Sequence, residues 1–245
     1  MTAGQRLAPR LVQKGPMLRA KLTPSPYMQH LIIAIDGPSG AGKGTVASTV
    51  ARTLGYRHVD TGAMYRAVAW KALREGVALD DEPSVTRVAE GSAIDVEGGV
   101  VLVDGHDVTR AIRTPEIDRA AATVARLPRV RDVLVARQRA YSRDGGVVME
   151  GRDIGTVVCP DADVKIYLDA SAEERARRRS NDTAHSGGEA GEAAVAKSIA
   201  ARDQSDTTRA VSPLTLAPGA VHIDTTHMPV ATVVDRVMAI VRQVR

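Results

Sequence analysis

The sequence predicts an α/β protein built on a five-stranded parallel β-sheet flanked by helices. Five short segments rich in Val, Ile and Leu are typical of buried strands, namely 31–35, 57–59, 147–150, 164–168 and 221–223. Segments with helical periodicity lie between them, and helical crossovers join parallel rather than antiparallel strands. A glycine-rich loop follows the first strand and opens a helix. Together these observations favour a parallel sheet over a sandwich or a bundle.

The composition agrees with a soluble globular protein. The chain has 245 residues, of which 44% are hydrophobic and 25% charged. No apolar run is long enough to cross a bilayer and the N-terminus lacks the apolar core of a secretory signal, so we expect no membrane partner. The single cysteine, Cys159, cannot form an internal disulfide. It suits a cytoplasmic protein, in which we expect it to be a small buried side chain.

The first 28 residues differ from the rest of the chain. They contain four prolines and five basic side chains, no acidic residue and no apolar periodicity. We therefore expect 1–28 to be a disordered leader or upstream extension, and 29–245 to be the folded domain. The net charge of +4 lies mainly in this leader. A nearly neutral body with few aromatic residues argues against nucleic-acid binding, although a nucleic-acid-binding protein that uses the leader is the alternative from another class.

The elements follow in order along the folded domain. The strand 31–35 ends at Asp36 and is followed by a loop and a helix over 43–54, then the strand 57–59 and a helix over 64–74. Residues 94–97 and 100–103 alternate around Gly98 and Gly99, which predicts a hairpin, with a third strand near 106–108. This hairpin indicates an inserted subdomain. The small, polar, glycine-rich segment 181–194 is typical of a mobile loop or lid.

The glycine-rich loop has the sequence and the context of a phosphate-binding P-loop. It comprises Gly37, Pro38, Ser39, Gly40, Ala41, Gly42, Lys43, Gly44 and Thr45. Its backbone N–H groups can surround phosphate oxygens, and Lys43 can reach the β- and γ-phosphates of a nucleoside triphosphate. Gly44 stands where such loops usually carry Ser or Thr. We therefore expect Mg²⁺ to be held mainly by phosphates and water, with Thr45 as the candidate protein ligand.

Several classes of P-loop protein are excluded. Guanine-specific switches read their base with an Asn-Lys-x-Asp motif, and the one asparagine of this chain, Asn181, is followed by Asp182. Motor and helicase ATPases usually need more chain and a basic or aromatic track for a polymer. Small-molecule kinases remain.

Four further clusters mark an acceptor site and, with the P-loop, carry a family resemblance. They are Asp60-Thr61-Gly62-Ala63-Met64-Tyr65-Arg66, Pro128-Arg129-Val130-Arg131, Glu150-Gly151-Arg152-Asp153-Ile154-Gly155-Thr156 and Arg202-Asp203-Gln204-Ser205-Asp206-Thr207-Thr208-Arg209. In order and spacing the chain resembles the bacterial cytidylate kinases over residues 30–244. The resemblance implies transfer of the γ-phosphoryl group of ATP to CMP or dCMP. It also implies a monophosphate-binding insertion at about 62–127 and a lid at about 176–198.

The resemblance also implies the residues that hold CMP. They are Thr61, Tyr65, Arg66, Arg131, Gly151, Arg152, Asp153, Arg202, Asp206 and Arg209. Arg66 and Arg152 would grip the phosphate with forked donors, which a lysine cannot copy. Asp206 would suit the sugar hydroxyls. The family often has a serine near the base, where this chain has Ala122 and Thr123.

Base recognition is expected from one charged pair. Asp153 can accept from the exocyclic amine of cytosine, and Arg131 can donate to its acceptor edge. Uracil would present a carbonyl to Asp153 and leave a buried polar group unpaired, at a cost of about 1–3 kcal/mol. A kinase of the same architecture acting on UMP, AMP or another small acceptor remains the rival interpretation.

Catalysis is expected to need charge neutralisation and no general base, because the attacking phosphate oxygen is already anionic. The expected catalytic residues are Lys43, Arg152, Arg175 and Arg179, the last two sharing one face of a lid helix. The strand-end residues Asp104, Asp169 and Asp224 could mimic a magnesium-binding acid, but turn capping is commoner. The scattered histidines predict no zinc site. We expect a cytoplasmic monomer whose partners are ATP and CMP or dCMP.

Overall fold

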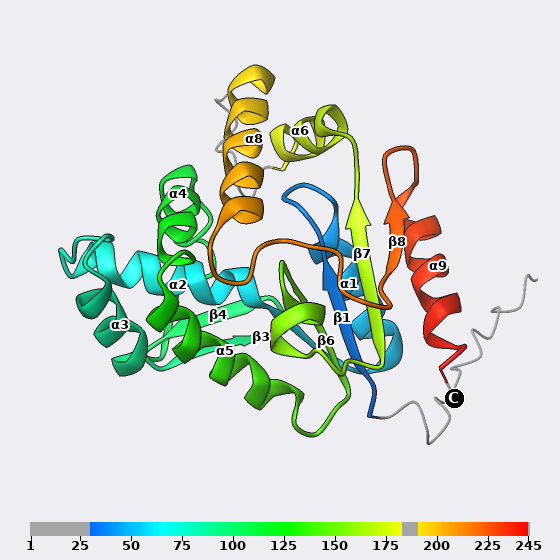
Figure 1. The fold of residues 1–245 in the computed structure, drawn as a ribbon, viewed down its shortest axis with the longest axis horizontal. Coiled ribbons are helices and arrows are strands. Elements are labelled where there is room, and N and C mark those ends of the chain that lie inside the picture. The colour runs from blue at the N-terminus through cyan, green and yellow to red at the C-terminus, as the bar shows by residue number, and fades with distance from the viewer. Residues whose placement is uncertain (1–29, 183–190, 245) are drawn as a thin grey trace, which may run out of the picture.

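A computed structural model describes residues 30–182 and 191–244 of the chain (Figure 1). The expected leader 1–28 therefore lies outside the described residues. Five parallel strands form the central sheet in the order β2-β6-β1-β7-β8, which confirms the predicted fold class. Their bounds are β1 (Ile32–Asp36), β2 (Arg57–Asp60), β6 (Val147–Gly151), β7 (Val164–Asp169) and β8 (Val221–Asp224). Each agrees with a predicted strand to within a residue or two.

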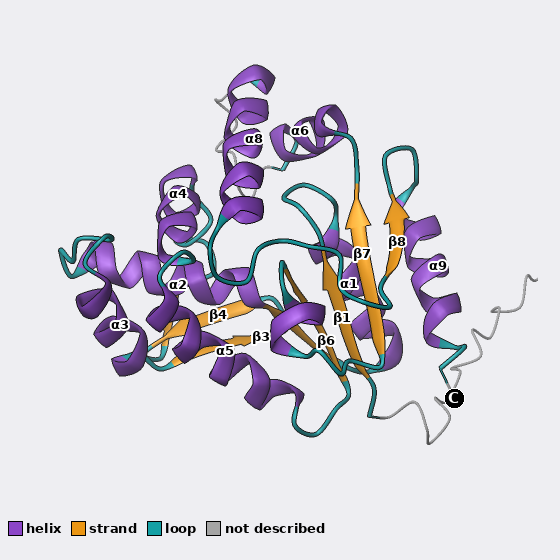
Figure 2. Cartoon of the chain, viewed as in Figure 1, coloured by secondary structure: helices purple, strands orange, loops and turns teal. Residues whose placement is uncertain are grey.

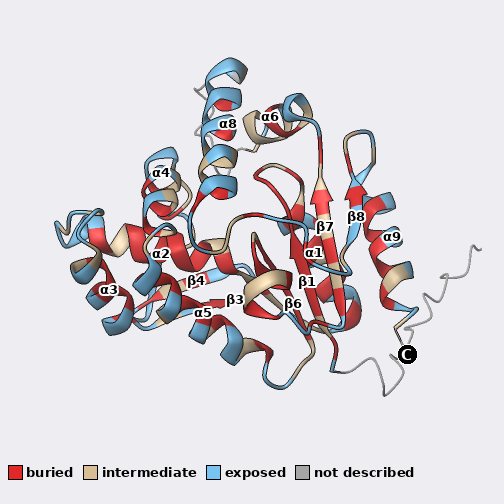
Figure 3. Ribbon diagram, in the orientation of Figure 1, coloured by how far each residue is buried: buried red, intermediate tan, exposed pale blue. Residues whose placement is uncertain are grey.

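Helices cover both faces of this sheet. On one face α1 (Lys43–Leu54) and α9 (Val230–Val241) pack against Ile33 and Ile35 of β1. On the other face α5 (Pro128–Ser142) and a π-helical turn, η2 (Ile154–Val158), pack against Ala34 of β1. Because successive strand side chains point to opposite faces, both of which are covered, residues 32–35 of β1 are all apolar and the strand ends at Asp36. Figure 3 shows the central strands buried along most of their length.

The lone cysteine belongs to the second of these two cores. Cys159 is buried beside η2, where the removal of water raises the pKa of its thiol. This placement confirms the expected role as a small apolar side chain.

A second lobe is inserted between β2 and β6. It contains α2 (Thr61–Arg74), α3 (Glu82–Gly91), α4 (Pro115–Val124) and a sheet of β3 (Ile94–Glu97), β4 (Val100–Val103) and β5 (His106–Asp107). The strands pair antiparallel in the order β3-β4-β5, as the alternation around Gly98 and Gly99 predicts. A separate apolar core that includes Met64, Val101 and Leu134 holds the lobe together.

Helix α2 begins three residues before the predicted start at Met64. Its N-cap is Asp60, whose Oδ1 accepts a hydrogen bond from the Ala63 N–H at 3.0 Å. The cap lies at the end of β2, so strand and helix join without a loop. This junction brings Thr61 and Arg66 to the edge of the sheet where the P-loop begins.

Two helices lie over the carboxyl ends of the strands. They are α6 (Ala172–Ser180) and α8 (Glu192–Thr208), which pack side by side through Ala176, Val195 and Ile199 (Figure 2). The loop predicted over 181–194 is shorter at its C-terminal end, because α8 begins at Glu192. Residues 183–190 lie outside the described part of the chain.

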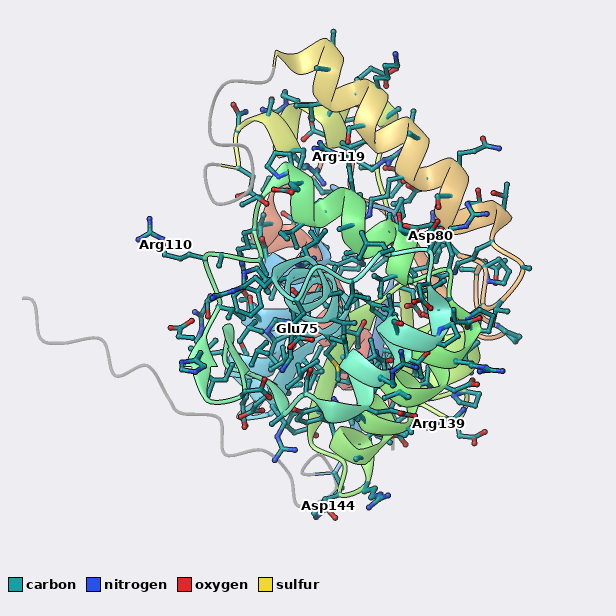
Figure 4. All side chains as sticks on the ribbon, turned by 90° about the vertical axis from the view of Figure 1, so that its left-hand side faces the viewer. Glu75, Asp80, Arg110, Arg119, Arg139 and Asp144 are labelled. Atoms are coloured by element: carbon teal, nitrogen blue, oxygen red, sulfur yellow. The ribbon has the colours of Figure 1, made fainter. Side chains whose placement is uncertain are left out.

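The outer surface is strongly charged. In Figure 4, which faces the inserted lobe, side chains such as Arg110 and Asp144 project outward at its margins. Within residues 30–182 and 191–244, no helix is long and apolar enough to cross a membrane.

Candidate functional site

The P-loop has the backbone geometry that phosphate binding needs. Gly37 has a φ of 146°, and a Cβ at this residue would lie 1.9 Å from the carbonyl oxygen of Leu168 on β7. Gly40 has a φ of 79° and a Cβ there would lie 2.8 Å from the Arg175 carbonyl oxygen. Both positions therefore require glycine, because no side chain fits and the φ values disfavour other residues. The loop leads directly into α1, whose N-terminus contributes unpaired N–H groups and a positive dipole.

Lys43 is buried at the start of α1. Its Nζ donates to the Pro38 carbonyl oxygen at 2.7 Å, which closes the loop on itself. Burial and, to a smaller extent, the positive charge of Arg152 lower the pKa of Lys43 to about 7. Glu150 opposes this shift. The ammonium group is thus held beside other cations, an arrangement that an anionic ligand would stabilise.

The P-loop opens onto a large cavity. The cavity has a volume of about 1120 Å³ and lies at the carboxyl ends of β1, β2 and β6, beneath α6 and α8. From the P-loop, residues 39–45 line it. Nine arginines also line it, and five of them come from five different elements or loops, namely Arg66, Arg113, Arg152, Arg179 and Arg202. The cavity therefore combines a phosphate loop with converging guanidinium groups.

Arg113 was not predicted from the sequence. It lies between β5 and α4, outside every motif that marks the acceptor site, and only the fold of the inserted lobe brings it to the cavity. A single arginine in a loop carries no sequence signal, so this residue could not have been found without the structure.

Arg66 is positioned by the end of β2. Its Nη2 donates to Asp60 Oδ2 at 2.7 Å, and its Nε has no hydrogen-bond partner among the residues that the structure describes. Burial would raise the pKa of Asp60, but Arg66 and the Ala63 N–H lower it. Thr61 does not line the cavity. Its hydroxyl donates to the Glu150 carbonyl oxygen at 2.7 Å and ties α2 to β6.

Arg152 lies immediately after β6. Its Nε donates to Asp206 Oδ2 on α8 at 2.8 Å, and Arg202 lies 4.0 Å from the same oxygen. Burial acts to lower the pKa of Arg152, but Asp206 raises it above its ordinary value. Burial acts to raise the pKa of Asp206, and the two arginines lower it. The four predicted residues of this part of the site, Gly151, Arg152, Arg202 and Asp206, are therefore brought together.

Behind the cavity lies a buried polar cluster that contains the expected base-reading pair. Arg131 Nη2 donates to Asp153 Oδ2, and Arg209 Nη2 lies 3.6 Å from Asp153 Oδ1. The guanidinium carbon of Arg131 lies 5.7 Å from the centre of the Tyr65 ring, whose hydroxyl pKa burial raises to about 12. Arg131 Nε has no hydrogen-bond partner in the described part of the chain. These four residues are neighbours, as predicted, but they do not line the open cavity.

Comparison with known proteins places this site in a family. The cytidylate kinase family model matches residues 33–243. The chain belongs to the cytidylate kinase family. It is 52% identical over 212 residues to a cytidylate kinase from Pelotomaculum thermopropionicum, covering 84% of this chain and 94% of the relative. It is 50% identical over 215 residues to a cytidylate kinase from Desulfitobacterium hafniense, covering 86% and 93%. A solved shikimate kinase from Acinetobacter baumannii matches 89% of this chain and 98% of its own at 14% identity, with a TM-score of 0.45.

In this cytidylate kinase family member, the two predicted lid arginines, Arg175 and Arg179, both lie on α6 but have different surroundings. Arg179 lines the cavity and donates to Asp118 on α4. Arg175 lies behind the P-loop instead, where its Nη1 donates to the Ser39 carbonyl oxygen at 3.2 Å and to Asp203 Oδ2 at 2.5 Å. Arg175 thus supports the loop, whereas its neighbours Arg177 and Arg178 line the cavity.

The structure also places Thr123 and the three strand-end aspartates of the kinase. Thr123 is exposed, does not line the cavity and donates to the Arg119 carbonyl oxygen at 3.5 Å, so this hydroxyl is not brought to the site. Asp169 and Asp224 accept hydrogen bonds from nearby backbone N–H groups at 2.8 and 2.9 Å, in agreement with turn capping. Asp104 accepts from the Ala93 N–H at 2.8 Å.

Glu150, which the sequence analysis left out of the site, is the carboxylate nearest to the substituted P-loop position. It ends β6, and its Oε1 lies 3.2 Å from where a Cβ of Gly44 would be. His58 Nε2 lies 3.0 Å from the same oxygen. Burial would lower the pKa of His58, but the hydrogen bond to Glu150 raises it. Hard carboxylate and hydroxyl oxygens suit Mg²⁺, so Glu150 and the exposed Thr45 fit a metal that also binds phosphates.

Proposed function

We propose that the protein transfers the γ-phosphoryl group of ATP to CMP or dCMP, giving ADP and CDP or dCDP. The observation that carries this proposal is that Lys43 of the P-loop, Arg66 and Arg152 line the same cavity. The family membership supports cytidine as the acceptor nucleoside. The buried pair of Arg131 and Asp153 supports a site that selects cytosine.

The donor and acceptor would enter from opposite sides of the P-loop. The cavity extends past the P-loop to a partly apolar end lined by Arg178, Thr225, Met228 and Val230, where we place the adenine ring of ATP. On the other side, Arg66, Arg113 and Arg152 would hold the CMP phosphate. Ion pairs to Asp60 and Asp206 already orient two of these arginines. The γ-phosphate would then lie between Lys43 and Arg152.

The chemistry needs alignment and positive charge. An anionic oxygen of the CMP phosphate forms a bond to the γ-phosphorus while the bond to the bridging oxygen of ADP breaks, and no proton must be removed. Lys43, Arg152 and Arg179 would stabilise the charge on the phosphoryl oxygens. Mg²⁺, which Glu150 and Thr45 would hold with the phosphates, supplies further neutralisation of the triphosphate when it is bound. Arg175 would act only by supporting the P-loop.

A nucleotide panel tests the proposed function. Release of ADP is measured with ATP and Mg²⁺ in the presence of CMP, dCMP, UMP or AMP and in a control without acceptor. We expect CMP and dCMP to accelerate release strongly over the control. Equal rates with and without acceptor would identify an ATPase, and a higher rate with UMP or AMP would contradict the choice of acceptor. Monomeric state and cytoplasmic location stay predictions.

The base-reading pair leads to a selectivity prediction. We expect Asp153→Asn to lower kcat/KM for CMP by about 10- to 100-fold, because an amide group would place a donor against the cytosine amine. The dissociation constant of ATP should stay within about twofold, since Asp153 does not line the cavity onto which the P-loop opens. Steady-state kinetics and direct ATP binding check both values. Equal weakening of CMP and ATP use would contradict the role of Asp153.

The lowered pKa of Lys43 predicts that the protein takes up a proton when it binds ATP. Because the pKa is about 7, this amine is mostly neutral at a pH of about 8 in the free protein. Binding of triphosphate should favour the ammonium form, so binding takes up a proton and ATP affinity falls by up to about tenfold per pH unit above 7. Calorimetry in two buffers of different ionisation enthalpy measures the uptake. Identical binding enthalpies in both buffers would contradict it, and Lys43→Met should show no uptake.

A further inference from the structure

Asp36 is a buried acid that neither the motifs nor the mechanism above uses. It is the last residue of β1, next to Gly37 of the P-loop, and is 3% exposed. Its two carboxylate oxygens accept hydrogen bonds from the backbone N–H groups of Ile154 and Gly155, each at 2.8 Å. These N–H groups open η2, the turn that directly follows Arg152 and Asp153. A single side chain thus connects the start of the P-loop to the segment that carries two expected acceptor-binding residues.

Asp36 caps the N-terminus of η2 in place of Asp153. Asp153 is the N-cap residue of η2, and an aspartate in this position usually accepts from the N–H two or three residues further along. Here the side chain of Asp153 makes no such bond, and Gly155, two residues along, donates to Asp36 instead. The Asp153 carboxylate is therefore available to Arg131 and Arg209 in the buried polar cluster behind the cavity.

We propose that Asp36 is a positioning residue for cytosine selection: by capping η2 from strand β1, it keeps the carboxylate of Asp153 directed toward Arg131 and Arg209 instead of its own helix. The inference rests on the proposed function, because it assigns Asp153 to the cytosine amine. The inference adds that selectivity for the acceptor base depends on Asp36, an acid next to the P-loop. Asp36 itself touches neither nucleotide in this account.

The charge on Asp36 is part of this arrangement. Burial raises the pKa of Asp36 to about 6, the two N–H groups oppose the shift, and Asp153 adds to it while Lys43 lowers it. Lys165 also lies close to this turn, within 3.4 Å of where a Cβ of Gly155 would be. At a pH of about 8 the group is ionised and both oxygens can accept. An asparagine would offer one acceptor and would turn an N–H donor toward the second backbone N–H.

The matched experiment compares Asp36→Asn with Asp163→Asn. Asp163 Oδ2 accepts from the Ile32 N–H at 2.7 Å at the other end of β1, so both variants weaken a carboxylate contact to backbone N–H groups at an end of the same strand. For each variant and the wild type, kcat and KM are measured at a pH of about 8 with CMP and UMP, together with direct binding of ATP. We expect Asp36→Asn to lower the ratio of kcat/KM for CMP over UMP by about tenfold or more, mainly through the KM of CMP. Asp163→Asn should leave the ratio unchanged.

A double variant shows whether Asp36 acts through Asp153. If it does, Asp36→Asn should change the ratio little in a protein that already carries Asp153→Asn, because coupled sites are not additive. An unchanged CMP to UMP ratio in the single variant, or a fully additive loss in the double variant, would overturn the proposal. If Asp36→Asn weakened ATP binding as much as it weakened CMP use, the variant would act through the P-loop, and the proposal would be overturned. The same assay also tests the proposed function separately. A wild-type protein that used UMP as well as CMP would refute the proposed function.

A second variant covers the case in which Asp36→Asn does not fold. A methyl group in Gly155→Ala would touch Asp36 Oδ2 at 3.4 Å and meet the Ala217 Cβ at 3.1 Å, which is tighter than ordinary van der Waals contact, so relief of this contact displaces the turn that donates to Asp36. We expect it to lower the CMP to UMP ratio in the same direction. A folded Gly155→Ala protein with the wild-type ratio would then overturn the proposal.

Discussion

Lys43→Met is expected to lower kcat by about 10²- to 10³-fold while the protein stays folded, because it removes one preorganised positive charge from the transferring phosphoryl group. The folded state should tolerate the change. Lys43 is buried, its pKa is lowered to about 7, and its described hydrogen bond is to the Pro38 carbonyl oxygen. A methionine of similar length would fill this space and bury no charge.

The matched control for this variant is Lys165→Met. Lys165 Nζ also donates to a proline carbonyl, that of Pro218 at 3.4 Å, but Lys165 does not line the cavity. We expect this control to keep most of the activity. The thermal midpoint and circular dichroism of both variants check the fold. Loss of folding in Lys43→Met, or a similar loss of kcat in both variants, would contradict the role assigned to Lys43.

Arg152→Lys is expected to reduce kcat/KM for CMP by about 100-fold or more, although the charge is kept. The Arg152 guanidinium binds Asp206 through Nε and the Gly151 carbonyl oxygen through Nη1 at 3.3 Å, and the same side chain lines the cavity. A lysine has one donor atom in place of three and cannot reach Asp206 and a phosphate in the same geometry. Both kcat and the KM of CMP should therefore change.

The control for Arg152→Lys is Arg119→Lys on the exposed surface of α4. It makes the same chemical change outside the cavity and should leave both kinetic parameters within about twofold. Figure 4 labels this residue on the inserted lobe. If Arg152→Lys retained wild-type kcat and KM, the assignment of Arg152 to the phosphate would be wrong.

The parts of the fold that depend on local sequence could be predicted. Helix α1 begins and ends where the sequence analysis placed it, because a glycine precedes it and Gly55 ends it with a φ of 71°. The strands of the central sheet were found because each is a short apolar run with turn residues on both sides. The β3–β4 hairpin was found because Gly98 and Gly99 can adopt the positive φ values of the turn.

The contacts that complete the site could not be predicted in the same way. Asp36 meets Ile154 and Gly155 across more than a hundred residues, and Glu150 meets His58 across β6 and β2. Such pairs carry no pattern in one sequence, since each residue alone is an ordinary strand-end acid or histidine. The spacing of Arg175 and Arg179 correctly implies one helix, but only the packing of α6 shows that Arg175 supports the loop and Arg179 lines the cavity.

The central claim is that one cavity brings the γ-phosphate of ATP to the phosphate of CMP. A single-turnover reaction with ATP labelled in the γ-phosphate, followed with and without CMP, tests this directly by showing where the label goes. We expect that with CMP the label appears in the β-phosphate of CDP as ADP is formed, and that without CMP it stays in ATP. Label released as inorganic phosphate at the same rate in both reactions would contradict it.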